Sequence, residues 1–228
     1  MKIARVHSIF HEQGYFITEP LIEAGQCAAL AAAVADLSDS GAGTRALLAL
    51  PWCRALAKVL LLHTVLQPFL PPAAAAVQCT YFEKSAQKNW LVAMHQDLSI
   101  PVAQRVEHPQ LTGWSEKENT LFVQPPASVL ENILAVRVHL DACGADDGAL
   151  RVVPRSHRSS RLDDTAMQAL RQANGEVLCC VPQGAALLLA PSLLHASSKV
   201  TSGKPRRVLH FQFAPPVLPF GLQWHDTV

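Results

Sequence analysis

The first third of the chain carries apolar residues at helical spacing. Residues 21–37 form an alanine-rich stretch in which apolar positions recur every three or four residues, and a second such stretch spans 51–66, before a proline-rich segment. This spacing predicts two amphipathic helices that pack on a core. We place the first helix start at Thr18, a candidate cap, with Pro20 in the first turn.

The rest of the chain is dominated by short β-type runs. A polar, irregular segment at 104–119 predicts a loop, and an amphipathic stretch at 162–174, followed by Gly175, predicts one further helix. Helices followed by several short strands favour an antiparallel β-sandwich or barrel with flanking helices over an alternating βαβ fold. The strands are expected at 14–17, 77–82, 134–140, 149–153, 176–181, 185–189 and 207–214.

We expect a single domain over residues 1–228. Its helical N-terminal part spans about 18–70 and its mainly β core about 75–215. A chain of this length commonly folds as one all-β unit.

The last strand has two chemically different faces. Leu209, Phe211 and Phe213 alternate with Arg206, His210 and other polar positions. Because successive strand residues point to opposite sides, the aromatic face must pack on another layer, and the Arg206 face needs a wet or ligand-filled interior. The alternative is an exposed edge strand with a surface arginine.

Composition narrows the function classes. Half of the residues are hydrophobic, and the net charge of +1 gives no electrostatic footprint for nucleic acid. Apolar runs are too short to span a bilayer, and the N-terminus lacks the apolar stretch of a secretory signal. The six cysteines show no CxxC spacing, which predicts reduced, mostly buried thiols in a cytoplasmic protein. A small molecule is therefore the expected partner.

Two His-x-Asp triplets are candidate metal ligands. A histidine and an aspartate two residues apart on extended backbone point to the same side, and a second histidine completes the facial triad of non-haem iron(II) oxygenases. The candidates are His95 with Asp97 and His139 with Asp141. Spacing does not choose between them. The first is favoured because Asp141 begins a turn, where aspartate is expected for conformational reasons.

The second histidine must come from later in the chain, from His157, His195, His210 or His225. Arg206 distinguishes His195, because it follows on the polar face of the next strand. A guanidinium grips a carboxylate through two parallel charge-assisted hydrogen bonds, as the distal carboxylate of 2-oxoglutarate requires.

The order of several motifs resembles the phytanoyl-CoA dioxygenase family over most of the chain. One departure is Arg155, which occupies a turn position that usually holds glycine. The motifs are HEQGYF at 11–16, YFEK at 81–84, MHQDL at 94–98, GALRVVPRSH at 148–157, LLHASS at 193–198 and KPRRVLH at 204–210, which places Arg206 eleven residues after His195.

The resemblance implies a fold and a set of site residues. The fold would be a double-stranded β-helix (jelly roll, cupin-like core) with flanking helices. Iron(II) would be held by His95, Asp97 and His195, and 2-oxoglutarate by Arg206. By the same resemblance Gln96 and Ser197 lie beside the co-substrate, Lys84 lies near the pocket, and His139 with Asp141 falls on a central strand that provides no ligand.

The activity implied is that of an iron(II)- and 2-oxoglutarate-dependent dioxygenase. Such an enzyme uses O2, releases succinate and CO2, and would here hydroxylate a C–H bond of a small metabolite or biosynthetic intermediate. Asp97 argues against halogenation, since related halogenases carry a small residue there. A loop at 104–126 is expected to act as a lid. The alternative is a metal-binding cupin-like isomerase or sensor that does not use 2-oxoglutarate and does not need Arg206.

Overall fold

The computed structural model describes residues 2–37, 43–159 and 161–228. Helices predominate near the N-terminus, and short strands predominate from residue 75 onward. In chain order the elements are α1 (Lys2–Gln13), β1 (Tyr15–Ile17), α2 (Ala24–Ala33), the 3-10 turn η1 (Ala35–Leu37), β2 (Gly43–Thr44), η2 (Leu47–Ala49), α3 (Pro51–Leu62), β3 (Ala75–Lys84), β4 (Val92–His95), β5 (Ile100–Val102), β6 (Thr112–Lys117), β7 (Thr120–Gln124), α4 (Ala127–Leu130), β8 (Leu134–His139), η3 (Ala145–Asp147), β9 (Leu150–Val152), η4 (Ser156–Arg158), α5 (Asp164–Asn174), β10 (Val177–Cys179), β11 (Ala186–Leu189), β12 (His195–Ser197) and β13 (Arg206–Ala214).

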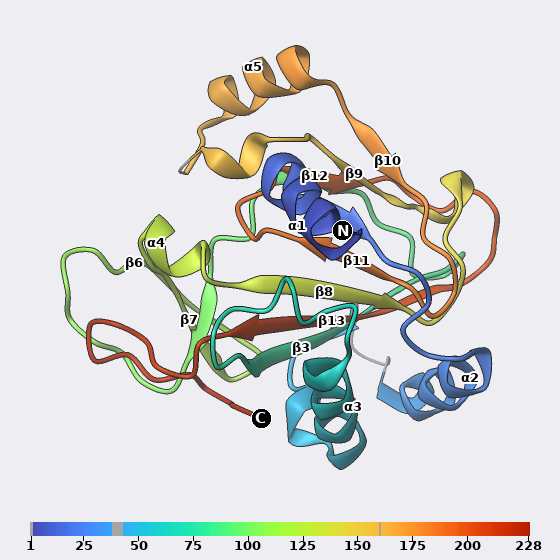
Figure 1. Ribbon diagram of the computed structural model, residues 1–228, viewed down its shortest axis with the longest axis horizontal. Coiled ribbons are helices and arrows are strands. Elements are labelled where there is room, and N and C mark those ends of the chain that lie inside the picture. Colours follow the sequence, from blue (N-terminus) through green and yellow to red (C-terminus); the bar gives the residue numbers. More distant parts are fainter. Residues whose placement is uncertain (1, 38–42, 160) are drawn as a thin grey trace.

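The strands form a large sheet, a smaller one and a side sheet. The large sheet has the order β1-β11-β8-β13-β3-β2, the smaller one β10-β9-β12-β4, and the side sheet β5-β7-β6. All paired strands within these sheets are antiparallel. Figure 1 shows β8, β13 and β3 at the centre, with β9 and β12 to one side of them. This is the expected mainly β double-stranded β-helix with flanking helices.

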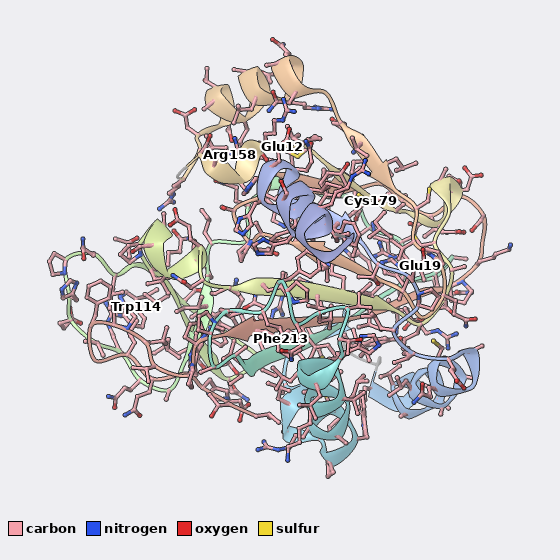
Figure 2. The ribbon with its side chains drawn as sticks, viewed as in Figure 1. Glu12, Glu19, Trp114, Arg158, Cys179 and Phe213 are labelled. Carbon is pink, nitrogen blue, oxygen red and sulfur yellow. The ribbon has the colours of Figure 1, made fainter. Side chains whose placement is uncertain are left out.

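Helices cover the outer face of the large sheet. Figure 1 shows α2 and α3 on the same side of β8, β13 and β3, and α5 on the opposite side of the molecule. Phe211 and Phe213 of β13 pack in one cluster with Leu56 and Leu60 of α3, and Figure 2 shows Phe213 on the side of the sheet nearest α3. Burial of this apolar layer, at about 25 cal/mol per Å², holds the central strands in place.

The opposite face of β13 points into the barrel. Arg206, His210 and Gln212 are buried there, between β8 and β3. The strand is therefore central, and the alternative of an exposed edge strand is wrong. A second apolar cluster, which includes Leu150, Val152 and Leu187, fills another part of the space between the sheets.

Several element boundaries differ from those expected. The helix predicted at 21–37 begins at Ala24, where the Gln26 side chain accepts a hydrogen bond from the Glu23 backbone N–H at 3.0 Å. Thr18 is not its cap, because the Thr18 hydroxyl accepts a hydrogen bond from the Ala186 N–H at 2.9 Å. The helix expected to reach 66 ends at Leu62.

The segment 104–119 is only partly a loop. β6 covers Thr112–Lys117 and pairs with β7, a strand that the sequence did not reveal. The side chains of β6 are mostly exposed or half-buried, so the segment lacks the apolar alternation that marks a strand. Its pairing with β7 decides its conformation.

Helix α1 was also missed. It ends at Gln13 and is followed by Gly14, which has φ +82° and whose N–H donates to the Phe10 carbonyl at 2.7 Å. Val6 and Phe10 pack against the main apolar cluster, and their spacing of four residues was the available signal.

All six cysteines are free, five of them buried and Cys180 exposed, as the sequence predicted. Among the described residues, none of the helices combines the length and the apolar character needed to cross a bilayer.

Arg155 adopts a left-handed conformation, with φ +68° and ψ −4°, which explains why glycine is usual at this turn. Its guanidinium forms an exposed ion pair with Glu12 at 2.6 Å. Figure 2 shows Glu12 near Arg158, which belongs to the same turn. A left-handed backbone costs a residue with a side chain about 1–2 kcal/mol, whereas an exposed ion pair contributes at most about 1 kcal/mol.

We therefore expect Arg155→Gly to be more stable than Arg155→Ala by about 1 kcal/mol, because both lose the ion pair but only alanine keeps the strain. Urea unfolding of the two variants measures the difference. Equal stability, or a more stable alanine variant, would contradict a strained turn.

Candidate metal centre

Two histidines face each other across neighbouring strands. His95 ends β4 and His195 begins β12, and the two are direct partners in the antiparallel register. Cross-strand partners have Cβ atoms about 4.5–5.5 Å apart, so the two rings must lie close together. Their centroids are 4.2 Å apart.

Asp97 completes a cluster with these histidines. Its backbone N–H donates to the Pro191 carbonyl at 2.9 Å, which ties the segment after β4 to the turn before β12. One carboxylate oxygen lies 3.5 Å from Nε2 of His95, and the other lies 3.7 Å from Nε2 of His195. One ligand atom from each of the three residues lies within 4.8 Å of the others, a separation that one metal ion can bridge.

The hydrogen bonds of the two rings fix their tautomers. Nδ1 of His95 lies 2.8 Å from the Ala93 carbonyl, and Nδ1 of His195 lies 2.9 Å from the Leu193 carbonyl. A carbonyl only accepts, so Nδ1 carries the proton and Nε2 presents its lone pair. Both lone-pair nitrogens are the atoms nearest Asp97, which is the arrangement that metal-binding histidines require.

Burial and mutual charge set the protonation of the cluster. Burial lowers the pKa of His195 to about 4, so the ring is neutral. Burial would raise the pKa of Asp97, but its interactions with His195 and His95 hold that pKa below its usual range. Burial also opposes protonation of His95, yet the hydrogen bond and charge of Asp97 outweigh it and raise the pKa of His95. The carboxylate of Asp97 and the neutral imidazole of His195 are therefore in the forms that bind a divalent metal, and His95 joins them on release of its Nε2 proton.

A basic pocket adjoins the cluster. A cavity of about 110 Å³ has His95, Asp97 and His195 in its wall, together with Lys84, Ser197 and Arg206. Lys84 is fully buried and donates to the Ser197 hydroxyl and the Ser198 carbonyl, both at 2.6 Å. Arg206 donates from Nη1 to the Gly148 carbonyl at 2.8 Å. The sequence predicted all four of Lys84, Ser197, Arg206 and His195 for this region.

Three cations of this pocket are buried without a salt bridge. Lys84, Arg206 and Arg137 of β8 all line the cavity, yet none forms a salt bridge within the described part of the chain. Among the same residues, Nε of Arg206 and Nε of Arg137 have no hydrogen-bond partner. Buried charges without partners are costly, so the pocket is suited to an anionic ligand.

The second His-x-Asp triplet does not form a metal site. Asp141 accepts three hydrogen bonds from Arg207, from the backbone N–H at 2.9 Å, Nε at 2.8 Å and Nη2 at 2.7 Å. His139 is buried on β8, and within residues 2–37, 43–159 and 161–228 neither ring nitrogen has a hydrogen-bond partner. Burial, with Arg137 and Arg206 nearby, holds the pKa of His139 well below its usual value.

The remaining histidine candidates do not belong to the group of His95, Asp97 and His195. His157 contacts the His11 carbonyl at 3.2 Å, and His225 lies beside Asp226 near the C-terminus. His210 lies inside the barrel, where its Nδ1 is 3.1 Å from Nη1 of Arg137.

Gln96 has its amide directed away from the basic pocket. The amide donates to the Ser192 carbonyl at 2.8 Å and accepts from the Leu162 N–H at 3.0 Å. Gln96 borders a different cavity from the one that holds Arg206. Its expected place beside the co-substrate stays a prediction, and its hydrogen bonds connect the His95–Asp97 segment to the turn before His195.

Two residues of β3 that the sequence did not single out line a cavity that His95 and Asp97 also border. Gln78 and Thr80 line the cavity that Gln96 borders, and their alternation with buried apolar residues on β3 was the available signal. Arg137 of β8 also faces the interior, where it lines the basic pocket.

We expect Asp97→Asn to weaken binding of Co²⁺ by about a hundredfold or more, because removal of a charged ligand exceeds the 10–100-fold typical of residues that only orient ligands. Asp141→Asn is the matched control, since it alters the other triplet and should leave Co²⁺ affinity within about twofold of wild type. Isothermal titration measures both, and circular dichroism checks folding. Equal losses in the two variants would exclude Asp97 as a specific ligand.

Comparisons with known proteins identify the family of the chain and structures that share its fold. A family model described as phytanoyl-CoA dioxygenase matches residues 10–208. The fold resembles the non-haem α-ketoglutarate-dependent epimerase SnoN from nogalamycin biosynthesis, at 15% identity and TM-score 0.71 over 99% of this chain and 86% of that chain.

Two further solved structures share the fold. EctD from S. alaskensis in its apo form is 19% identical, with TM-score 0.68 over 96% of this chain and 81% of that chain. AviO1 from Streptomyces viridochromogenes Tue57 is 19% identical, with TM-score 0.65 over 95% and 96%. No curated protein matches the sequence. With 199 residues matched by its model, the chain belongs to the phytanoyl-CoA dioxygenase family.

Proposed function

We propose that this protein is an iron(II)- and 2-oxoglutarate-dependent dioxygenase that hydroxylates a C–H bond of a small metabolite or biosynthetic intermediate. The observation that carries the proposal is that one cavity has both the His95–Asp97–His195 cluster and the unpaired cations Lys84 and Arg206 in its wall. Metal ligands and a dianion-binding pocket are the two requirements of this chemistry.

The donor set fits iron(II). Two imidazole nitrogens and one carboxylate form the facial triad that leaves coordination positions open. The convergent Nε2 lone pairs of His95 and His195 support this assignment. Iron(II) with bound 2-oxoglutarate supplies the activation of dioxygen and the cleavage of a C–H bond, with release of succinate and CO2.

The basic pocket fits 2-oxoglutarate. Arg206 has an unpartnered Nε and would clasp the distal carboxylate, and Lys84 and the Ser197 hydroxyl would orient it. Because these groups are held by β3, β12 and β13, they keep the co-substrate in one position relative to the metal ligands.

Asp97 supports hydroxylation over halogenation, because its carboxylate occupies the position that a halide would need. Among structures of the same fold, one of EctD contains 2-oxoglutarate and 5-hydroxyectoine, whereas SnoN is an epimerase and SnoK a carbocyclase. The fold is therefore compatible with hydroxylation, epimerisation and ring formation, and the product distinguishes these reactions.

The test is turnover under 18O2 with iron(II), 2-oxoglutarate and a candidate metabolite found by succinate release. A hydroxylase places one labelled oxygen in succinate and the other in the product. Labelled succinate together with an unlabelled product that is rearranged, epimerised or desaturated would replace hydroxylation with another outcome of the same site. A protein that forms no succinate at all would favour the isomerase or sensor.

Arg206 and Arg207 form a matched pair for the co-substrate pocket. Arg206→Ala should weaken 2-oxoglutarate binding by about a hundredfold, because it removes a buried charged partner. Arg207→Ala removes the neighbouring arginine, which points to the other face and pairs with Asp141, and should leave binding unchanged. Anaerobic titration of the visible iron(II)–2-oxoglutarate absorption band measures both. Normal turnover in Arg206→Ala would favour a protein that does not use 2-oxoglutarate.

Lys84 should make 2-oxoglutarate binding depend on pH. Burial, and then the charges of Arg206 and Arg137, lower the pKa of Lys84 to about 8. Below that pH Lys84 is charged and attracts the dianion. As pH rises through 8 the free protein loses this charge, so affinity should fall between pH 7 and 9.

Lys84→Met should bind 2-oxoglutarate more weakly at pH 7 and should lose this pH dependence. Lys88→Met, which removes an ion pair with Glu83 outside the pocket, should keep it. The same anaerobic titration, repeated across the pH range, measures all three proteins. A wild-type profile that is flat between pH 7 and 9 would exclude this role of the Lys84 charge.

A further inference from the structure

A second, larger cavity lies on the other side of the metal-ligand cluster. It has a volume of about 330 Å³, and Phe82, His95 and Asp97 border both this cavity and the basic pocket. The cavity therefore reaches the metal ligands from a side that Lys84 and Arg206 do not line. It is the place where a substrate would meet the metal, so the inference below rests on the proposed function.

One wall of this cavity is a buried polar floor formed by Gln78 and Thr80 of β3 with His210 and Gln212 of β13. In the register of the two strands Thr80 is the partner of His210, and Gln78 is the partner of Gln212. The floor is thus two cross-strand pairs on one face of a central sheet. All four side chains are at least nine-tenths buried, with 4–9% exposure.

The alternate residues of the same strands are apolar. Cys79 and Tyr81 of β3 and Leu209, Phe211 and Phe213 of β13 point to the opposite face and belong to the main core. Burial is comparable on the two faces, so solvent exposure does not account for the polarity of the floor. An apolar chain that entered this cavity would remove hydrogen-bonding groups from water without replacing their partners.

The Arg137–His210 contact fixes the chemistry of one end of the floor. A guanidinium has only donors, so Nη1 of Arg137 donates to Nδ1 of His210 across 3.1 Å. The His210 proton is therefore on Nε2, and the ring is a fixed N–H donor toward the cavity that it lines. A substrate has to present an oxygen acceptor to this group.

Gln212 supplies the complementary group. Its Oε1 is buried and has no hydrogen-bond partner among the residues that the structure describes, although the side chain lines the cavity. Gln78 and Thr80, by contrast, are joined by a hydrogen bond from Gln78 Nε2 to the Thr80 hydroxyl at 3.3 Å. The floor therefore offers one donor and one acceptor from residues two apart on the same face of β13. Neighbouring hydroxyl groups, each both donor and acceptor, match this pair.

The basic side chains of this cavity are already engaged. Arg45 is 2.5 Å from Glu118 in an ion pair, and the Lys117 ammonium lies 5.1 Å above the Phe122 ring. The polar floor itself carries no formal charge. The part of the substrate that contacts the floor is therefore uncharged.

We propose that the substrate is a small, oxygen-rich molecule with vicinal hydroxyl groups, which His210 and Gln212 bind so that a neighbouring C–H bond lies beside the metal ligands. Arg137 acts as a positioning residue through His210. An acyl chain does not fit this floor, and a polyol or a hydroxylated ring does.

The test compares cis-cyclohexane-1,2-diol with cyclohexanol, which has the same ring and one hydroxyl fewer. Binding is measured by anaerobic calorimetry on the protein loaded with iron(II) and 2-oxoglutarate. The diol should bind about tenfold more tightly, as expected for one further hydrogen bond to a buried, otherwise unpaired group. Decanoyl-CoA is the apolar-chain comparison and should not bind at comparable concentration.

Two variants assign the preference to the floor. Gln212→Leu and His210→Phe should each reduce the preference for the diol to about twofold or less. Because both are made, the test still works if one of them fails to fold. Gln223→Leu and His225→Phe make the same replacements at exposed positions near the C-terminus and should keep it. The proposal is overturned if both floor variants keep the preference for the diol. It is also overturned if the wild-type protein binds cyclohexanol or decanoyl-CoA as tightly as the diol or more tightly, or does not bind the diol.

Two readouts separate this inference from the proposed function. The visible absorption band of iron(II) with 2-oxoglutarate reports the proposed function, and its absence in wild type would refute that function whatever the diol does. Nitrogen-15 NMR of the metal-free protein reports the floor alone. His210 should be the Nε2–H tautomer in wild type and a mixture in Arg137→Met, and a wild-type Nδ1–H tautomer would refute the fixed donor.

Discussion

The alternation of side chains along β13 is the constraint on which the rest of the structure depends. Alternate residues from Leu209 to Phe213 are apolar and pack beneath α3, and the polar residues between them point into the barrel. A shift of one residue in register would exchange the two sets and place aromatic rings at the site. The apolar layer outside therefore stabilises the position of Arg206, His210 and Gln212 inside.

That constraint also allows an interior rich in unpaired charge. Lys84, Arg137 and Arg206 come from three adjacent strands, β3, β8 and β13, and meet beside the metal ligands. Their desolvation is unfavourable, and the packing of the outer face has to offset it. The buried cations therefore lower the stability of the fold in order to form a pocket for an anion. Binding sites are commonly less stable than the scaffold that holds them.

The cluster of His95, Asp97 and His195 depends on a different sheet. His95 and His195 are strand partners, so the register of β4 with β12 sets the distance between their rings, and two backbone carbonyls select their tautomers. Asp97 follows after β4 has ended and is held by the turn at Pro191. The metal site and the basic pocket therefore come from facing sheets, and the barrel brings them together.

The sequence by itself determined the β-rich class, the two faces of β13 and a short set of candidate ligands, because local alternation and spacing encode them. It did not reveal α1, β5 or the pairing of β6 with β7, since β6 has little apolar alternation and gains its conformation from its partner strand. Spacing alone left two His-x-Asp triplets open, and the family resemblance favoured His95 with Asp97. The tertiary structure gives the physical reason, because whether an aspartate meets a second histidine or an arginine such as Arg207 depends on strands far apart in the chain. That the whole chain is one domain stays a prediction. The polar floor on β3 and β13 likewise exists only once the two strands are paired, because its donor and acceptor come from residues whose partners are more than a hundred positions away.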